Sequence, residues 1–500
     1  MVDVPLSVNR PFRLFVHLTV AILTGIVAFT AAAGVVDSIP IASVAAVGGI
    51  AGTLVWLRRH AGLVGALARV PPFYRRVFIV GAVAAVGQLL ALTVFIIDPH
   101  VATWRPHLWA PQQSQHSCVS SYWVACTALG GEASIYDETL YSQPQRDPTA
   151  QRKARTLGPF NIDVYEYPPP FLTLPAFVRI VAPDFYSFRR LWFALNLVIV
   201  VVGAVVVARR LDTALGTHAV WLTPFVIAAP PIIATLQMGN IQLAVIAAAA
   251  TAMLLFERRS YAAGGLLLGY VTVSKLFPGV LVFYLLLRRD WRPVGWTSAW
   301  SVVIAVATLA AFGATPYLDF LDHMPKLLSG EAFPAFRNPH AIGVNQSVPG
   351  LVFKLKLWGV PHMDFTAMKI VGWVYTAVVV AVTAWLALWV RARGREPLIW
   401  LVILILATLR SPFLPTYAGF PTLWLATLVA AAYADRPAIV RTALVVWGMH
   451  AILFGPGTIY PPVNAVWTTV QTVATFVLVC LTCRLLTTPS GVDDLESHLA

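Results

Sequence analysis

Long apolar runs separated by short basic turns make up most of this 500-residue chain. An apolar run of about 20 residues can cross the hydrocarbon core of a bilayer as a helix. The pattern predicts about twelve spanning helices, one of which begins at residue 219 and passes through Pro230 and Pro231. The other expected spans are residues 12–34, 39–57, 77–97, 191–208, 241–256, 295–315, 366–390, 398–409, 416–433, 439–454 and 463–483. The predicted fold class is therefore an all-α polytopic membrane protein.

One apolar segment, residues 261–287, does not fit a simple span. An arginine pair flanks it at each end, which places both ends on the same side of the membrane. Its 27 residues are too few to cross a bilayer of about 30 Å twice at about 1.5 Å per residue. We expect a broken, re-entrant hairpin with its turn at Ser274, Lys275 and Pro278, surrounded by protein or by a water-filled cavity.

Two long polar stretches interrupt the apolar pattern, at residues 98–188 and 316–364. The first is rich in Gln, Ser, Pro, Tyr and Trp and is too polar to lie in hydrocarbon. Arginine clusters mark the turns on the opposite side, which the positive-inside rule makes cytoplasmic. Both termini are then cytoplasmic and both long loops extracytoplasmic, so we expect a multi-pass protein of the plasma membrane with its active site on the extracytoplasmic face.

This topology divides the chain into three parts. Residues 1–76 hold two N-terminal spans and a basic cytoplasmic linker, residues 77–484 form the transmembrane core with its two outer loops, and residues 485–500 form a cytoplasmic tail. The first apolar run is too long for the core of a secretory signal peptide, so we expect it to be retained as a span.

Composition and charge support a membrane protein and argue against a nucleic-acid-binding one. The chain is 58% hydrophobic and only 11% charged, whereas soluble domains carry about 25% charged residues. Lys and Arg number 35 against 22 Asp and Glu, an excess that suits either nucleic acid or anionic lipid headgroups. The arginines occur as short clusters between apolar runs, which favours membrane lipids as the partner and no nucleic acid.

Few carboxylates lie on the outer side, and three of them are candidate catalytic groups. Asp163 and Glu166 lie among tyrosines in the run DVYEY at 163–167, which leads into three prolines. Aromatic faces stack on a sugar ring while carboxylates take hydrogen bonds from its hydroxyls. The alternative is an interfacial aromatic belt with solvated acids. Asp98 is the third candidate, because it directly follows a span and a helix therefore fixes its position.

Cations on the same side are candidates for binding a phosphate. Arg410 ends an apolar run at the outer membrane edge, where a polyprenyl phosphate presents its anion, and arginine holds phosphate with a planar fork. The alternative is snorkelling to lipid headgroups. Lys275, at the turn of the predicted hairpin, either binds a ligand or pairs with helix-end carbonyls. Arg337 and His340 of the second outer loop complete this set.

Four cysteines are too few for a disulfide framework, and no pair of them has nearby histidines at zinc-ligand spacing. Cys118 and Cys126 lie eight residues apart, which on a helix is too far for a disulfide, so free thiols are expected. Cys480 and Cys483 are expected to pack as small hydrophobic residues. We therefore predict no metal site and no cofactor.

Five short sequence motifs, or phrases, occur in a fixed order along residues 77–483. They are Ser121-Tyr122-Trp123 with Ala128-Leu129-Gly130-Gly131-Glu132 and Tyr136-Asp137; Tyr167-Pro168-Pro169; Gly239-Asn240-Ile241-Gln242-Leu243; Lys275-Leu276-Phe277-Pro278; and Asn345-Gln346-Ser347. Together with the topology, these phrases resemble glycosyltransferase family 87 of the GT-C superfamily. The two spans before residue 77 are then an N-terminal addition.

The resemblance implies a GT-C-like bundle that performs inverting transfer of a sugar from a polyprenyl-phosphate donor to an acceptor hydroxyl. A hexose such as mannose is the expected sugar, and a lipid or glycan is the expected acceptor. The family implies a loop carboxylate as general base, cations on the departing phosphate and usually no metal. The residues expected to contact sugar or acceptor are Tyr122, Tyr165, Tyr167, Asn240, Gln242, Asn345 and Gln346.

The sequence departs from the family pattern at two places. Cys118 stands where the family has its catalytic aspartate, four residues before the matched tyrosine, so either the base comes from elsewhere or catalysis is lost or altered. The phrase beginning Ser411-Pro412 lacks the family's histidine, and Arg410 is the candidate to supply its charge. Two alternatives therefore stay open: a transporter or lipid flippase, and a non-catalytic relative that acts in envelope assembly. The transporter requires carboxylates within the spans, and the sequence has almost none there.

Overall fold

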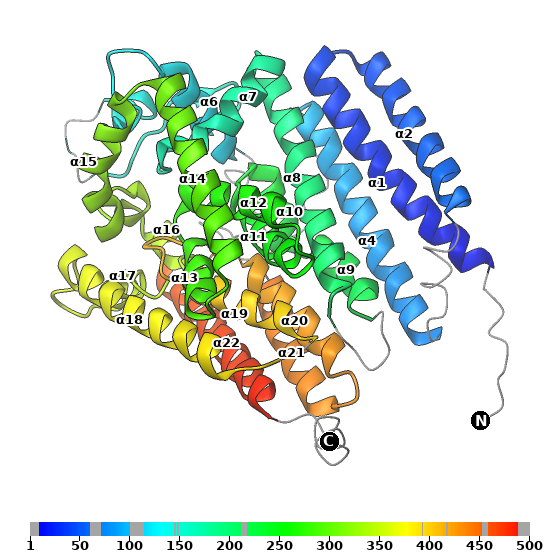
Figure 1. Cartoon of the computed structure of the whole chain (residues 1–500). Coiled ribbons are helices and arrows are strands. Elements are labelled where there is room, and N and C mark those ends of the chain that lie inside the picture. The colour runs from blue at the N-terminus through cyan, green and yellow to red at the C-terminus, as the bar shows by residue number, and fades with distance from the viewer. Residues whose placement is uncertain are drawn as a thin grey trace.

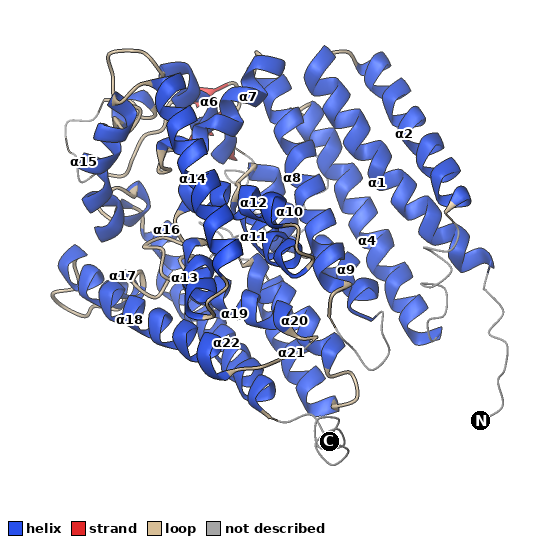
Figure 2. Ribbon diagram, in the orientation of Figure 1, coloured by secondary structure: helices blue, strands red, loops and turns tan. Residues whose placement is uncertain are grey.

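The computed structural model describes residues 10–60, 72–100, 115–144, 147, 150–211, 218–392, 394–416, 419–452 and 459–488. Most of the expected tail at 485–500 and of the arginine-rich linker before residue 72 lies outside these ranges. The described residues form a bundle of helices with one small sheet at one end (Figures 1 and 2). An all-α polytopic membrane protein is therefore the fold that the structure supports.

Seven described helices are long and apolar enough to cross a membrane. Their bounds are α1 (Arg10–Val36), α2 (Ile39–Arg59), α4 (Pro72–Ile97), α8 (Phe185–Ala208), α14 (Trp291–Phe312), α18 (Phe365–Trp389) and α22 (Pro461–Thr487). An eighth span results if α9 (His218–Ala228) and α10 (Pro230–Met238) count as one helix bent by 56°. The bend falls at Pro230 and Pro231, whose rings and missing N–H groups interrupt the helical hydrogen bonding.

Four further apolar helices are shorter than a full span: α11 (Gln242–Glu257), α19 (Glu396–Thr408), α20 (Phe420–Ala432) and α21 (Pro437–Ala451). Every residue of α20, and every residue of α19 from Pro397 onward, is buried. Helices α11, α19 and α20 are apolar all round because other helices surround them, and a short buried helix need not match the thickness of the bilayer. Helix α21 buries only Ala443, Val446 and His450. The structure thus supports seven or eight candidate spans, and the number twelve stays a prediction.

The N-terminal pair α1 and α2 lies on one flank of the molecule (Figure 1). Helix α1 packs against α2, α8 and α4. Helix α2 buries only Ala42 and Leu57, and it exposes apolar side chains such as Val44 and Val47. An apolar helix exposed in this way suits contact with lipid tails.

The expected break within residues 261–287 is present. Helix α12 (Tyr261–Lys275) ends before α13 (Gly279–Leu287) begins, and Pro278 lies at the start of the second helix. Between them Leu276 has a φ of +55°, and the Phe277 N–H donates to the Lys275 carbonyl over 2.6 Å. This tight three-residue turn is a strained backbone conformation for leucine. The helix break is confirmed, and its re-entry into the membrane stays a prediction.

The first outer loop is folded in its described parts. It contains β1 (His116–Ser117), α6 (Cys118–Ala128), η1 (Glu138–Leu140), β2 (Thr156–Leu157), β3 (Phe160–Ile162), η2 (Pro169–Leu172) and α7 (Thr173–Val181). The strands form a sheet in the order β1-β3-β2, with β1 parallel to β3 and β2 antiparallel to it. Arg152 joins its turns by donating to Ser142 Oγ, the Tyr141 carbonyl and the Ile162 carbonyl. A basic side chain in this loop therefore has a structural use.

The second outer loop contributes α15 (Thr315–Ser329), η3 (Pro334–Arg337), α16 (Pro339–Gly343) and α17 (Leu351–Leu357). Figure 1 shows α15 beside the part of the molecule that carries α6 and α7. Buried Lys354 of α17 donates to the hydroxyls of Thr468 (2.8 Å) and Thr469 (3.3 Å), so it fastens this loop to α22. Burial lowers the pKa of Lys354 to about 7.

Arginine clusters meet where α8 and α11 end and α19 begins. Arg210 bonds to Glu257 Oε2 over 2.6 Å and to Glu396 Oε2 over 3.2 Å. Three of the turns that the sequence assigns to the cytoplasm therefore lie together. This grouping fits the positive-inside assignment, which itself stays a prediction.

Candidate active site

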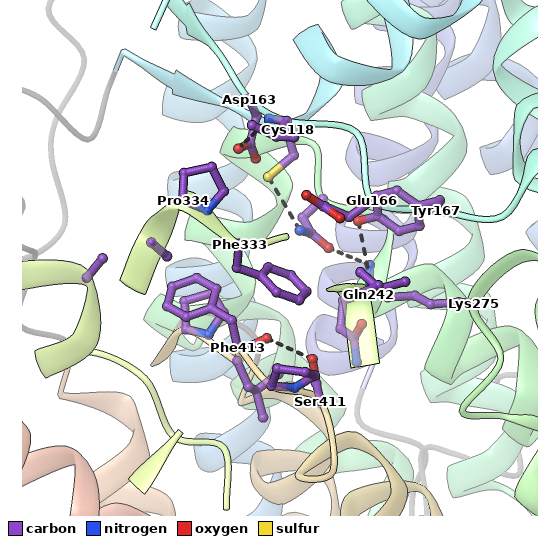
Figure 3. Close-up of a pocket in the computed structure, with 18 of the residues that line it drawn as sticks. Cys118, Asp163, Glu166, Tyr167, Gln242, Lys275, Phe333, Pro334, Ser411 and Phe413 are labelled. Carbon is purple, nitrogen blue, oxygen red and sulfur yellow. Dashed lines mark hydrogen bonds between the residues drawn. The ribbon is translucent and has the colours of Figure 1, made fainter. Parts of the chain in front are cut away.

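A cavity of about 770 Å³ lies where the two outer loops meet the α12–α13 break and the segment after α19 (Figure 3). Several residues predicted from the sequence line it: Asp163, Glu166, Tyr167, Asn240, Gln242, Lys275 and Arg410. A cavity that combines apolar walls with a few convergent charged groups is the usual form of a small-molecule site. Its lining thus unites residues that lie more than 240 positions apart in the chain.

Glu166 is the buried carboxylate of this cavity. Its Oε2 atom lies 2.9 Å from Nε2 of His323 on α15, and its Oε1 atom is buried with no hydrogen-bond partner among the described residues. Burial raises the pKa of Glu166 to about 7, although the hydrogen bond with His323 lowers it. A carboxylate with one oxygen held and the other free, and with a pKa near neutrality, suits a general base.

The segment around Glu166 is held rigidly. The Tyr165 hydroxyl donates to the Pro168 carbonyl (3.2 Å), and the Tyr136 hydroxyl donates to the Tyr167 carbonyl (2.8 Å). The ring of Tyr136 also stacks on His323, with centroids 4.8 Å apart. Tyr165 and Tyr136 therefore fix the backbone beside Glu166, and Tyr136 also packs against the histidine on which Glu166 depends.

Lys275 presents its ammonium group at the edge of the strained turn. Its Nζ atom lies 3.5 Å from the Tyr167 hydroxyl oxygen and 4.8 Å from the centre of the Tyr167 ring (Figure 3). Tyr167 in turn stacks on Phe171, with centroids 4.5 Å apart. Within the described ranges no carboxylate forms an ion pair with Lys275. A cation that faces a cavity without a protein counter-charge is a candidate anion site.

Arg410 supplies a second cation from the segment after α19. Its Nε atom donates to Thr376 Oγ1 on α18 over 2.6 Å, and its guanidinium carbon lies 6.0 Å from the centre of the Trp373 ring. Gly372 permits this approach, because a Cβ atom there would lie 3.1 Å from the guanidinium. No described carboxylate pairs with Arg410 either. Helix α18 thus orients the Arg410 guanidinium group, whose remaining N–H groups can bind an anion.

Asn345 and Gln346 are buried behind the wall and do not line the cavity. Asn345 donates to the Pro412 carbonyl (3.1 Å) and accepts from the Leu414 N–H (2.8 Å), while Gln346 donates to Gln471 Oε1 (2.7 Å). The side chain of Asn345 and the backbone N–H of Gln346, which donates to the Leu414 carbonyl over 2.7 Å, hold the segment that follows Arg410. Both residues thus contact the protein and lie outside the lining, and their contact with the sugar stays a prediction.

Tyr122 and Tyr165 are likewise fully buried and lie outside the lining. The Tyr122 hydroxyl lies 3.1 Å from the Tyr167 hydroxyl and accepts from the Ile241 N–H over 3.4 Å. Asn240 and Gln242 do face the cavity. The Asn240 side-chain oxygen accepts the Gln242 N–H (2.9 Å), which caps the start of α11.

Three further predicted residues, Asp98, Arg337 and His340, lie away from the cavity lining. Asp98 is exposed after α4, and its carboxylate accepts the His100 N–H over 2.9 Å. Arg337 forms a two-pronged pair with Glu138, at 3.0 and 3.1 Å. The backbone N–H of His340 donates to Asn338 Oδ1, and its side chain is absent from the lining. The structure does not bring these three residues to the other candidates.

The candidate roles of His323 and Thr376 were missed by the sequence analysis. His323 lies 157 positions from Glu166, and Thr376 lies 34 positions from Arg410. No local spacing links either residue to its partner. A histidine in an outer loop was the only available signal for His323, and Thr376 gave none.

The helical fold and this charged cavity are those of a membrane protein with a small-molecule site. Residues 165–415, half of the chain, match the model of glycosyltransferase family 87, and the protein belongs to that family. The matched region contains Glu166, Lys275 and Arg410 and begins after Cys118. The resemblance seen in the sequence is therefore confirmed.

A curated relative is the polyprenol-phosphate-mannose-dependent alpha-(1-2)-phosphatidylinositol mannoside mannosyltransferase of Mycolicibacterium smegmatis. It is 28% identical over 214 residues, which cover 39% of this chain and 44% of the relative. The match thus spans less than half of the relative's length. No solved structure matches the chain.

Proposed function

We propose that this glycosyltransferase moves a hexose, with mannose as the first candidate, from a polyprenyl-phosphate donor to a hydroxyl of a lipid or glycan acceptor. One observation carries the proposal: a single cavity holds the buried carboxylate of Glu166 together with Lys275 and Arg410, two cations that pair with no carboxylate among the described residues. The name of the mycobacterial relative supports the choice of polyprenyl-phosphate-mannose as donor.

In this mechanism the carboxylate of Glu166 accepts the proton of the acceptor hydroxyl. The acceptor oxygen attacks the anomeric carbon from the face opposite the phosphate, and the bond between that carbon and the phosphate oxygen breaks. The phosphate leaves with the bonding electron pair, and Arg410 and Lys275 stabilise its charge. His323 keeps Glu166 in place. A base and two cations in one low-dielectric cavity act without reorganising during the reaction.

Apolar residues of the cavity suit the rest of the donor. Phe333 and Phe413, whose ring centroids lie 6.2 Å apart, line it together with Leu327 and Leu328. Aromatic rings stack on the C–H face of a sugar, and aliphatic side chains accommodate a prenyl chain. We assign this wall to the sugar and the first isoprene units.

The proposed topology follows the arginine clusters. They place the chain ends and the short turns in the cytoplasm, and they place the cavity on the extracytoplasmic side of the plasma membrane. We retain residues 1–76 as an addition to the catalytic core at 77–484, because α2 packs on α1 and lies at the periphery of the bundle.

The test uses purified protein in liposomes with polyprenyl-phosphate mannose labelled in the sugar and an extract of envelope lipids. The expected result is transfer of label to an acceptor lipid, with release of polyprenyl phosphate and no transfer from a nucleotide-linked mannose. Movement of intact donor between the leaflets would instead support the flippase alternative. Absence of both transfer and movement, with the correct fold retained, would support the non-catalytic relative.

A further inference from the structure

Three side chains at one wall of the cavity direct metal-ligand atoms at a common point; Cys118 and Asp163 are labelled in Figure 3. Cys118 Sγ lies 3.5 Å from His116 Nε2, and Asp163 Oδ2 lies 3.6 Å from the same nitrogen. All three atoms lie within 4.8 Å of one another. All three residues line the cavity.

The local fold builds this cluster from two separate segments. Strands β1 and β3 are parallel, and their register pairs His116 with Asn161 and Ser117 with Ile162. Asp163 directly follows β3, so it comes beside β1, and Cys118 begins α6 directly after β1. The Val164 N–H donates to Asp163 Oδ1 over 2.9 Å, which leaves Oδ2 directed at His116.

A hydrogen-bonded relay of cysteine, histidine and aspartate does not explain this arrangement. In such a relay each of the two imidazole nitrogens takes one partner. Here the thiol and the carboxylate approach the same nitrogen, which carries either one proton or one lone pair. A cation among the three atoms would bind all of them at once.

The spacing of the atoms fits a tetrahedral metal site. With metal–ligand bonds of about 2.0 to 2.3 Å, neighbouring ligand atoms of a tetrahedral zinc site lie about 3.3 to 3.8 Å apart. The two measured separations, 3.5 and 3.6 Å, agree with this geometry. Thiolate and imidazole favour Zn²⁺ over Mg²⁺ or Ca²⁺, which prefer oxygen ligands.

We propose that His116, Cys118 and Asp163 bind one Zn²⁺ ion whose remaining coordination position is open to the cavity. A thiolate, a carboxylate and a neutral imidazole carry two negative charges, which balance the ion. Three protein ligands with one open position are the arrangement of catalytic zinc sites, whereas structural sites are closed by four. The open position would hold a water molecule or an oxygen of a substrate.

Asn240 is an independent sign of a metal-bound thiolate. Its Nδ2 group donates to Cys118 Sγ over 3.4 Å, and its own oxygen is held by the Gln242 N–H. That second bond fixes the orientation of the amide, so the N–H side faces the sulfur. Hydrogen bonds of this kind support the first ligands of metal sites.

This proposal departs from the metal-free chemistry expected from the family resemblance. Neither pair of cysteines in the sequence has nearby histidines at zinc-ligand spacing, whereas this cluster has one cysteine and an aspartate 45 residues further on. The proposal stands on geometry alone and does not depend on the transfer reaction. A protein without transferase activity could bind the ion, and an active one could lack it.

The experiment measures metal in the full-length protein, purified in detergent without chelators and then incubated with Zn²⁺ and desalted. We expect about one zinc per chain in the wild type and below about a tenth of that in Cys118→Ala. Cys126→Ala is the matched control, because Cys126 is also buried on α6 and lies outside the cluster. Equal zinc in Cys118→Ala and wild type, or none in either, would overturn the proposal.

A second measurement needs no variant. Co²⁺ replaces Zn²⁺ in such sites and shows a thiolate-to-metal charge-transfer band in the near ultraviolet together with intense tetrahedral d–d bands. We expect the wild-type protein loaded with Co²⁺ to show both, and added Zn²⁺ to abolish them. A Co²⁺ spectrum without the thiolate band would exclude Cys118 as a ligand and contradict the site.

Discussion

Glu166, which lines the cavity, and His323 come from different outer loops and meet with 2.9 Å between Oε2 and Nε2. His323 also stacks on Tyr136, whose hydroxyl holds the backbone at Tyr167. One contact thus couples the position of the candidate base to the packing of α15 against the first outer loop. A carboxylate placed in this way is fixed by both loops, as a positioned base requires.

The pH dependence of turnover follows from this pair. Burial raises the pKa of Glu166 to about 7, and a base acts only when ionised, so kcat/KM should rise with pH through about 7. His323→Ala removes a hydrogen bond that lowers this pKa, and the acidic limb should then move to higher pH. A pH–rate profile of both proteins checks this. An acidic limb near pH 4.5, or one that His323→Ala leaves in place, would contradict the assignment.

The stability of the folded protein should also depend on the ionisation of Glu166, but it should fall as pH rises. The pKa of Glu166 in the folded protein lies above its ordinary value of 4.5, so its contribution to stability is full below pH 4.5 and is lost as pH rises through about 7. Glu166→Gln removes this loss. In detergent, the thermal midpoint of Glu166→Gln minus that of wild type should therefore be larger at pH 8 than at pH 5. A difference independent of pH would show that the carboxyl is not perturbed.

Arg410→Ala should weaken donor binding by about 1.5 to 3 kcal/mol, or about 10- to 150-fold, because it removes charge-assisted hydrogen bonds to the phosphate. Arg337→Ala is the control, since Arg337 pairs with Glu138 and does not line the cavity. Binding of a polyprenyl phosphate to purified protein measures both. Unchanged affinity in Arg410→Ala would remove Arg410 from the site.

Membrane topology can be tested with two single cysteines. Ala133→Cys in the first outer loop should react with an impermeant maleimide added to intact cells, whereas Ser260→Cys before α12 should react only after the cells are opened. Both positions are exposed. The unsubstituted protein gives the background. Labelling of Ser260→Cys alone in intact cells would invert the proposed orientation.

The helical class, the break before Pro278 and the selection of Glu166, Lys275 and Arg410, which line the cavity, could be predicted from the sequence because each depends on local signals. Apolar run length indicates spans, proline interrupts a helix, and a charge beside an apolar run stands out. Buried helices such as α19 and α20 show where this reasoning weakens, because their composition resembles that of a span although they are shorter than one.

Pairings across the chain could not be predicted in the same way. Asn345 and Tyr122 were expected to contact sugar, and they instead hold backbone and neighbouring side chains behind the cavity wall. Asp98 had a helix to fix its position, yet that helix ends outside the cavity lining. The partners of these residues lie on other helices and loops, and periodicity along one segment carries no information on them.

The central claim, that Glu166 is the base of a sugar transferase, is tested most directly by single-turnover transfer from polyprenyl-phosphate mannose. Glu166→Gln should lower the rate by about 10² to 10⁴ and leave donor affinity nearly unchanged, whereas Asp98→Asn, which alters an exposed carboxylate, should keep the wild-type rate. A folded Glu166→Gln protein with the wild-type rate, or an equal loss in Asp98→Asn, would contradict the claim.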